Sequence, residues 1–510
     1  MRLFFINPPS NTSEAPAWIE PLGLCYVAGT CKDAGHQVEI RDLINTEIAD
    51  ARRLFAELDE FRPQIVGLTA LTENFNNGLE LARAVKRRYG CTVVFGGWHV
   101  SGEPSTVLEP AIDVVVRGEG EDTVLELLDH FQGKGPALSE IAGIAYKEGS
   151  SYRVNPPRTR IRKLDRLPAP LREGLPVERY RVPMLFSVPV TKMRTLSVQA
   201  SRGCPYKCVF CQTPAVWSSL WTKRTPAAVA DEVQGLIETY GINTLGIRDE
   251  EFTVRPSWVM ELCDEFAARG IPQKLGFGCF ARVDDVTPEL VAAMKKGGCA
   301  YVYMGVEATS PEESEKLQKF FKREEAERAF RLYREAGITT HGSWIIGFPW
   351  DTLPGLETAY DWIRTIPMDF LSVLYATPFG STPLAQYVKE NDLMSVDDLN
   401  YLNVNEPTIR TPHIPEDVLR TLAAHYRNRF FFHPRFLART AWQCVKSPMR
   451  LRVTTELFFE CLGRYRLRKR LEGNRHQTFV IPPELHEPLA IHHYRAPSFP
   501  LGAVEAAAAL

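Results

Sequence analysis

Three cysteines at the spacing C-x3-C-x2-C, Cys204, Cys208 and Cys211, constrain this chain more than any other feature of its sequence. Glycine, proline and lysine surround them, which is typical of a loop, and a short loop can fold around one metal centre. A closed structural zinc site needs four ligands, usually as two separated pairs, and no second pair lies nearby. A [4Fe–4S] cluster on three thiolates would leave one iron open to bind and reduce a small molecule. Three structural cysteines in a loop are a further interpretation, which the spacing disfavours.

The whole stretch from Ser201 to Cys211, SRGCPYKCVFC, resembles the cysteine loop of radical S-adenosylmethionine (SAM) enzymes. The resemblance implies that Cys204, Cys208 and Cys211 bind a [4Fe–4S] cluster and that the amino and carboxylate groups of SAM chelate its open iron.

The bulk composition excludes several classes of protein. A length of 510 residues suffices for two or three domains, and a net charge of -2 gives no electrostatic case for nucleic acid as a partner. The eleven cysteines form no secreted disulfide pattern, the apolar run at the start is too short for a signal peptide, and no stretch is long enough to span a bilayer. We therefore expect a cytoplasmic protein in a reducing compartment.

Residues 1–135 alternate short apolar strands with helical segments. This pattern predicts a doubly wound, Rossmann-like parallel sheet, which binds ligands beyond the carboxyl ends of its strands. The expected strands are 3–6, 38–40, 65–69, 92–97 and 113–120.

The loops after these strands resemble those of the cobalamin-binding domain that precedes many radical SAM domains. The resemblance implies that they hold cobalamin, and the glycines would let a large ring approach the backbone. No histidine here has Asp two residues before it, so the Asp-x-His-x-x-Gly motif that supplies an axial imidazole is absent, as is usual in this subgroup. His99 could lie near the ring, but we favour a loop histidine bonded to backbone. The candidate cobalamin-binding residues are Asn7, Thr69, Gly96, Gly97, His99, Gly118 and Glu119.

A linker with a small β-excursion is expected over 136–190, and a second β/α series begins near 191 and runs to about 390. Six β/α units predict a partial (β/α)6 version of the (β/α)8 barrel, in which chemistry sits at the carboxyl ends of the strands. The expected strands are 196–200, 244–249, 275–281, 300–305, 339–346 and 370–377.

Charged residues follow three of these barrel strands. By resemblance, Arg282 and Glu307 would contact the carboxylate and ribose of SAM, and Asp249 would shape the pocket of the cluster and SAM. Any one of them alone is more often a solvated or salt-bridged residue, but together they favour a site.

Residues 391–510 are expected to form a mainly helical C-terminal region. Thirteen basic residues stand against three acidic ones between His425 and His476, with large aromatic residues among them. This pattern predicts basic amphipathic helices suited to an anionic membrane surface. A helical cap with its aromatic side on the barrel and its arginines in water explains the pattern equally well.

The resemblance, which covers about residues 1–385, implies a cobalamin-dependent radical SAM C-methyltransferase. A radical made from SAM would take hydrogen from an unactivated carbon, methylcobalamin would supply the methyl group, and a reducing electron donor would be needed. Length, domain order and the basic tail look most like hopanoid C-3 methylases, which implies an apolar or lipid substrate. The alternatives are an anaerobic oxidative cyclase of bacteriochlorophyll synthesis and a non-catalytic cobalamin- or redox-responsive binding protein.

Overall fold

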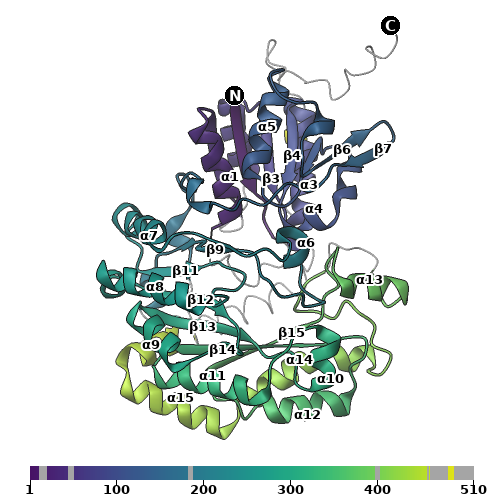
Figure 1. The fold of residues 1–510 in the computed structure, drawn as a ribbon. Helices are drawn as coiled ribbons and strands as arrows, with labels where there is room; N and C mark the ends of the chain where they lie inside the picture. The colour runs from purple at the N-terminus through teal and green to yellow at the C-terminus, as the bar shows by residue number, and fades with distance from the viewer. Residues whose placement is uncertain are drawn as a thin grey trace.

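Two α/β units, each built on its own β-sheet, lie one above the other and make up most of the molecule (Figure 1). The computed structural model describes residues 1–10, 20–43, 51–181, 188–396, 402–456, 459 and 481–486.

The first unit is built on a seven-stranded sheet in the order β2-β1-β3-β4-β5-β6-β7. Its first five strands are parallel, which confirms the predicted doubly wound fold. The strands β1, β3 and β5 are nearly all buried, as expected for a sheet with helices on both faces, whereas the edge strand β2 is less buried. The strands are β1 (Arg2–Asn7), β2 (Gln37–Asp42), β3 (Ile65–Thr69), β4 (Thr92–Gly96) and β5 (Val114–Val116). The helices are α1 (Leu22–Asp33), α2 (Ala51–Phe61), α3 (Phe75–Tyr89), α4 (Trp98–Gly102) and α5 (Glu121–Phe131).

The remaining two strands, β6 (Ile144–Glu148) and β7 (Ser151–Val154), form an antiparallel hairpin on the edge of this sheet. The hairpin is the β-excursion predicted for residues 136–190. Because β6 pairs directly with β5, the first sheet extends through Val154 into the range expected as linker.

The second unit is a six-stranded parallel sheet whose strands are neighbours in chain order, as in a partial barrel. This confirms the predicted architecture. The strands are β8 (Thr195–Val198), β11 (Thr244–Ile247), β12 (Gly276–Ala281), β13 (Cys299–Gly305), β14 (Thr339–Ile346) and β15 (Phe370–Tyr375). The helices are α6 (Thr213–Trp217), α7 (Pro226–Tyr240), α8 (Pro256–Ala268), α9 (Pro288–Lys296), α10 (Pro311–Leu317), α11 (Arg323–Glu335), α12 (Leu353–Ile363) and α13 (Pro383–Glu390).

Local sequence signals set the ends of the barrel helices. The Thr225 hydroxyl accepts a hydrogen bond from the backbone N–H of Ala228, so it caps α7, and Pro226 occupies the first helical position. Gly241 ends the same helix in the left-handed region at φ 61°, which a glycine adopts without strain.

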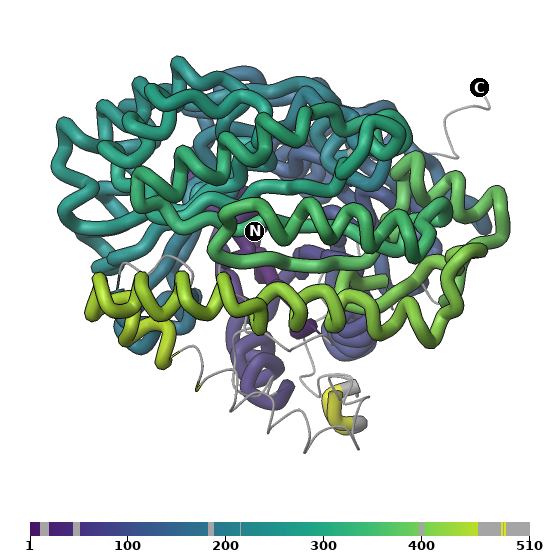
Figure 2. Tube along the Cα trace, turned by 90° about the horizontal axis from the view of Figure 1, so that it is seen from below, coloured from purple at the N-terminus to yellow at the C-terminus, as the bar shows by residue number. Residues whose placement is uncertain are grey.

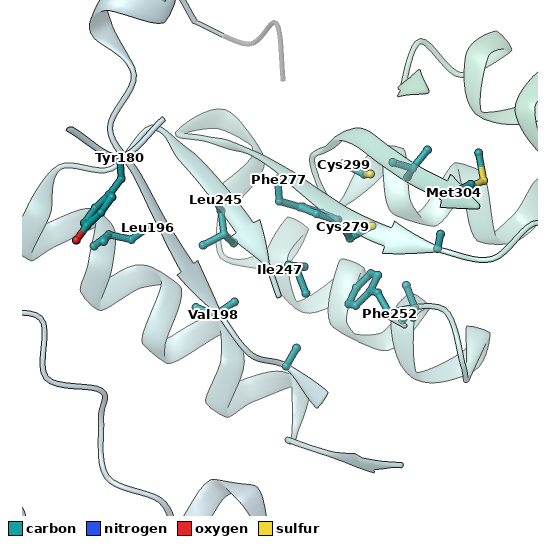
Figure 3. Packing of buried hydrophobic residues seen from close by; sticks show 14 of the residues in the cluster. Tyr180, Leu196, Val198, Leu245, Ile247, Phe252, Phe277, Cys279, Cys299 and Met304 are labelled. Atoms are coloured by element: carbon teal, nitrogen blue, oxygen red, sulfur yellow. The ribbon is translucent and has the colours of Figure 1, made fainter. Parts of the chain in front are cut away.

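The core of the barrel lies between the sheet and its covering helices. Alternate residues of each strand point into it, so Leu245 and Ile247 are fully buried on one side of β11. Figure 3 shows them packed with residues of β8, β12 and β13. The opposite side of the same strands carries different residues and is described below.

Beyond α13, the described residues include the helices α14 (Glu416–Phe431) and α15 (Pro434–Lys446). Seen from below, they run along one side of the barrel (Figure 2). Leu419, Tyr426 and Phe430 of α14 are buried, and Trp344 of β14 contacts the Tyr426 ring at 5.1 Å. The helix α14 therefore matches the expected cap, whereas α15 buries no side chain. Among the described residues, no helix is both long and apolar enough to cross a membrane.

A buried ionic network docks the first unit onto the barrel. The guanidinium of Arg202 donates to Glu119 at 3.0 Å and to Glu121 at 2.6 Å, and all three side chains are at most 4% exposed. Glu119 also accepts from Arg160 at 2.9 Å and from the Ile161 backbone N–H at 2.7 Å. Burial alone would lower the pKa of Arg202, but the two carboxylates raise it, so the guanidinium stays charged.

Removal of this guanidinium should destabilise the docked molecule strongly. In Arg202→Met the carboxylates of Glu119 and Glu121 lose their main cation while they stay buried, which costs about 3–5 kcal/mol. Urea unfolding of the full chain measures the change. Arg166→Met, which removes an exposed partner of Asp122, is the matched control and should cost less than about 1 kcal/mol. Equal effects of the two substitutions would contradict the prediction.

Candidate functional site

The carboxyl ends of the two sheets face each other across the docking surface. After β4, Gly102 approaches Gly380 so closely that a Cβ on Gly102 would lie 3.0 Å from the Gly380 carbonyl oxygen. The Ser381 hydroxyl donates to the Gly102 carbonyl at 2.7 Å, and Trp98 contacts Trp217 of α6 edge to face. The loops that bind ligands in each fold therefore meet at one place.

The cysteine loop follows β9 (Ser201–Arg202), which pairs with β10 (Thr222–Lys223) as a short antiparallel ladder. Gly203 adopts φ 87°, and a Cβ there would lie 2.2 Å from the Leu220 carbonyl oxygen. Only glycine can take this position. Its backbone N–H donates to Glu250 at 2.9 Å, so the acidic segment after β11 holds the start of the loop.

Cys204, Cys208 and Cys211 lie together on this loop, each partly buried and none in a disulfide. Burial, with smaller contributions from Glu251 and the other two thiols, raises the pKa of Cys204 to about 12. Within the described parts of the chain, no three Cys, His, Asp or Glu side chains are gathered as a site for a metal ion. The thiols are thus neighbours without converging on one point.

Two cations stand beside the cysteine loop. Lys319 and Arg282 both lower the pKa of Cys208 against the effect of burial, which raises it. Arg282 stacks on the Tyr206 ring at 3.7 Å and donates to Asp284 at 2.7 Å. The side chain of Lys319 pairs with Glu307.

The acidic residues expected near SAM have direct protein partners. Asp249, 1% exposed, accepts from the Ala200 backbone N–H at 2.7 Å and from the Ser201 hydroxyl at 2.6 Å. Burial raises the pKa of Asp249 to about 7 despite these bonds. Glu307 accepts from the Ser343 hydroxyl at 2.8 Å. Asp249 therefore braces the start of the cysteine loop, and Glu307 stands at the rim of the barrel.

The predicted residues of the first unit divide into two groups. Asn7 is buried and bonded to Asp42 and Asn74, and Glu119 belongs to the docking network. Thr69, Gly96, Gly97 and Gly118 lie at the carboxyl edge of the sheet. A Cβ on Gly97 would lie 2.7 Å from the Ala70 carbonyl oxygen, whereas one on Gly96 would meet nothing closer than 3.9 Å. Gly96 thus leaves open space beside the backbone.

His99 is buried inside the first unit. Its Nδ1 bonds to the Thr72 hydroxyl at 3.2 Å, and its ring lies 4.3 Å from that of Phe75. Burial lowers the pKa of His99 to about 4. His99 thus lies in the short helix α4, and its ring bonds to a side-chain hydroxyl. We had expected a loop histidine bonded to backbone.

These residues fit the implied cofactors. Three neighbouring thiols flanked by two cations suit a cluster in which each thiolate binds a different iron. One zinc ion, with Zn–S bonds of about 2.3 Å, would need them gathered at a single point with a fourth ligand. On the first sheet, the open backbone at Gly96 suits a large ring, and the engaged His99 suits cobalamin held without a protein imidazole.

Comparison with known proteins finds both domains. Residues 11–128 match the B12 binding domain family, and residues 198–363 match the radical SAM superfamily. The chain belongs to the cobalamin-binding radical SAM family. It is therefore an enzyme of the radical SAM methyltransferase class, and its cofactors are cobalamin, SAM and a [4Fe–4S] cluster.

The names of the relatives describe different activities. An uncharacterized methyltransferase of Pyrococcus horikoshii is 29% identical over 451 residues, 87% of this chain and 95% of the relative. An anaerobic magnesium-protoporphyrin IX monomethyl ester cyclase of Cereibacter sphaeroides is 28% identical over 85% of this chain and 71% of its own. A hopanoid C-3 methylase of Methylococcus capsulatus is 28% identical over 75% of this chain and 71% of its own length.

A solved structure supports the fold. A radical SAM methyltransferase of Kitasatospora setae, with tryptophan and a SAM analogue bound, superposes with a TM-score of 0.65. The superposition covers 85% of this chain and 84% of the other at 20% identity, so it speaks for the architecture alone.

Several site residues were missed by the sequence analysis. Arg202 lies inside the cysteine motif and Glu121 lies two residues after Glu119, but nothing local indicates that they meet across the two units. Lys319 follows α10, and only the fold brings it to the cysteine loop. The neighbours of Asp249 offered a usable signal, because Glu250 and Glu251 continue an acidic run directly after a strand.

Replacement of Cys204, Cys208 or Cys211 by Ala should remove iron binding and SAM cleavage, because each thiolate binds one iron. Iron content and 5′-deoxyadenosine formation after anaerobic reconstitution measure the result. Cys263→Ala and Cys299→Ala are the controls, since these buried thiols pack as small apolar groups and should keep full iron content. A normally loaded, SAM-cleaving Cys208→Ala protein would refute the assignment.

Proposed function

We propose that this enzyme transfers a methyl group to a carbon atom of a small organic substrate held between its two domains. The observation that supports the proposal is the placement of the cysteine loop against the carboxyl edge of the first sheet, through Arg202, Gly102 and Gly380. Two cofactor-binding edges that meet can align two reagents on one substrate, which is the main demand of such a reaction.

In this proposal Cys204, Cys208 and Cys211 hold the cluster, and Thr69, Gly96, Gly97 and Gly118 line the cobalamin edge. When bound, the cluster with SAM supplies the radical that removes hydrogen from carbon, and cobalamin supplies the methyl group.

The other assigned residues bind and orient. Arg282 and Lys319 place positive charge beside Cys208 and offset the negative charge of the thiolates. In this proposal Arg282 binds the SAM carboxylate with the part of its guanidinium that does not pair with Asp284. Glu307 accepts hydrogen bonds from the ribose hydroxyls, and Ser343 and Lys319 orient its carboxylate. Asp249 keeps the loop start in place through Ala200 and Ser201. The close Gly102–Gly380 contact helps to exclude water from one side of the site.

The relatives support two candidate activities, which differ in substrate and in the reaction carried out. The hopanoid C-3 methylase among the relatives supports methylation of a pentacyclic lipid. The cyclase relatives, at similar identity, support oxidative ring formation on a tetrapyrrole. We place C-methylation first because the Pyrococcus methyltransferase matches a larger share of both chains.

An anaerobic reaction with SAM labelled in its methyl group distinguishes these activities. Reconstituted enzyme, a reducing electron donor and fractionated cell extract should yield a carbon-bound labelled methyl group in one product, detected by mass spectrometry. Label in the neutral lipid fraction would support the hopanoid candidate. Loss of hydrogens or gain of oxygen without label would support the cyclase, and the absence of SAM cleavage in every fraction would support a binding protein instead. A Cys208→Ala enzyme is the control for chemistry that does not depend on the cluster.

The exposed face of α15 supports a second proposal, contact with a membrane surface. Leu437, Trp442 and Val445 project from one side of this helix and are 50%, 59% and 77% exposed. Arg435 precedes them and Lys446 follows, which gives the composition of an interfacial helix. Phe431, an aromatic residue of the same basic region that we expected to insert into a membrane, packs against Phe430 and Phe436. Phe458 and the arginines at 464, 466, 468 and 470 lie outside the described residues.

Loss of this apolar face should weaken membrane binding. We expect the native protein to sediment with anionic liposomes and to be released by salt, which screens the charges. Trp442→Gln with Val445→Gln should reduce the bound fraction at least five-fold at low salt, because each removes an apolar side chain that can enter the interface. Leu108→Gln, at an exposed leucine of the first unit, is the matched control and should bind as the native protein does. Failure of the native protein to sediment would exclude this role.

A further inference from the structure

The sheet of the barrel has a second side, turned away from the helices that cover its core. Gly246 of β11 and Arg248, which directly follows this strand, alternate with the buried Leu245 and Ile247 and so lie on this side. A Cβ on Gly246 would lie 3.1 Å from the Ser197 hydroxyl and 3.6 Å from Cδ of Arg248, which places all three residues together. We call this side the inward face. It leads up to the carboxyl edge that carries the cysteine loop.

The inward face carries a continuous row of rings. Phe280 of β12 contacts Tyr303 of β13 edge to face at 5.4 Å, and Tyr303 lies 4.7 Å from His341 of β14. His341 bonds to Tyr301 through Nδ1 at 2.7 Å and to Ser372 of β15 through Nε2 at 2.8 Å. Phe280, Tyr301 and Tyr303 are only half-buried. Flat rings fixed by hydrogen bonds and not covered by the rest of the described chain form a rigid wall for a flat ligand.

The histidine in this wall is neutral. Burial lowers the pKa of His341 to about 3, and its two ring nitrogens are engaged by hydroxyl groups. Of the residues named on this face, Arg248 alone then carries a charge at neutral pH.

Arg248 lacks a direct counter-ion among the described residues. Its guanidinium makes no ion pair and no side-chain hydrogen bond with them, and its one contact of this kind is with the Phe280 ring, 5.2 Å from its centroid. Burial lowers the pKa of Arg248, and the acidic groups that oppose this effect through their charge are Glu20 and Glu250. Glu20 is bonded to Arg172 and to the Ser197 backbone N–H, and Glu250 to Gly203. A half-buried guanidinium without an anion is costly, and its planar fork matches a carboxylate or phosphoryl group.

We propose that the inward face binds a small molecule with a flat ring system against Phe280 and Tyr303 and an anionic carboxylate or phosphoryl group on Arg248. This inference rests on the proposed function only in taking the bound molecule as the substrate, and it deepens that function by naming a substrate class. It disfavours a purely hydrocarbon polycycle, because such a ligand would leave the guanidinium unpaired when it displaced water.

Equilibrium binding of matched probes to the reconstituted full chain tests the proposal without turnover. The probes are 2-naphthoate, 2-naphthyl phosphate and the neutral 2-naphthalenemethanol, which share one ring system. The native protein should bind at least one of the anions ten-fold or more tightly than the alcohol. The tighter of the two identifies a carboxylate or a phosphoryl group as the preferred partner.

Substitutions assign the preference to this face. Arg248→Met should abolish the difference between anion and alcohol while alcohol binding is kept, and Arg248→Lys should retain part of it. Arg255→Met is the matched control, because Arg255 also lies over an aromatic ring, at 6.0 Å from Trp221, but on an exposed turn. Circular dichroism and cobalamin content verify that each variant is folded.

The proposal is wrong if the native protein binds neither anion more tightly than the alcohol. This includes the case in which both kinds of probe bind equally and the case in which neither binds. A preference that survives in Arg248→Met overturns it as well. The labelled-methyl experiment is independent of this outcome. An anion preference in a protein that transfers no methyl group would leave the site standing and refute only the proposed reaction.

Discussion

The pairing of Arg202 with Glu119 and Glu121 is the interaction on which the rest of the site depends. It joins the start of the cysteine motif to the loop after β5 and the first turn of α5, so one guanidinium fixes the position of the cluster loop relative to the first sheet. A buried charge network of this kind is a weak source of net stability, because desolvation offsets most of the attraction. Its value lies in specificity, since a misdocked arrangement would leave three buried charges unpaired.

The surrounding contacts also fix the position of the cysteine loop. Gly203 removes the side chain that would collide with Leu220, and Glu250 and Asp249 hold the loop start by hydrogen bonds to backbone and hydroxyl groups. Lys319 and Arg282 supply positive charge beside Cys208. The protein therefore builds the site from backbone conformations and charge pairs, and leaves the reactive chemistry to the cofactors.

The sequence predicted the parts of the molecule that depend on local patterns. Apolar runs bounded by Gly and Pro located the parallel strands of both units to within a few residues, and Thr225-Pro226 and Gly241 located the ends of α7. The expectations that depend on long-range contacts fared differently. His99 was taken as a loop residue bonded to backbone, but it lies in a short helix against Thr72 and Phe75. Glu119 was predicted to bind a cofactor, which remains a prediction, and its partners Arg160 and Arg202 come from distant segments that no local pattern connects to it.

The close contact of Gly102 with Gly380 has a consequence for how such enzymes diversify. Since a Cβ at Gly102 would already crowd the Gly380 carbonyl, no side chain can be removed there to bring the two backbones closer, and a larger residue would force them apart. New substrates must then be accommodated by exchanging residues on the inward strands, such as Arg248 or Tyr303, within a frame of constant width. An enzyme with this frame can acquire ligands of different charge and shape through its wall residues without rebuilding the alignment of its cofactors.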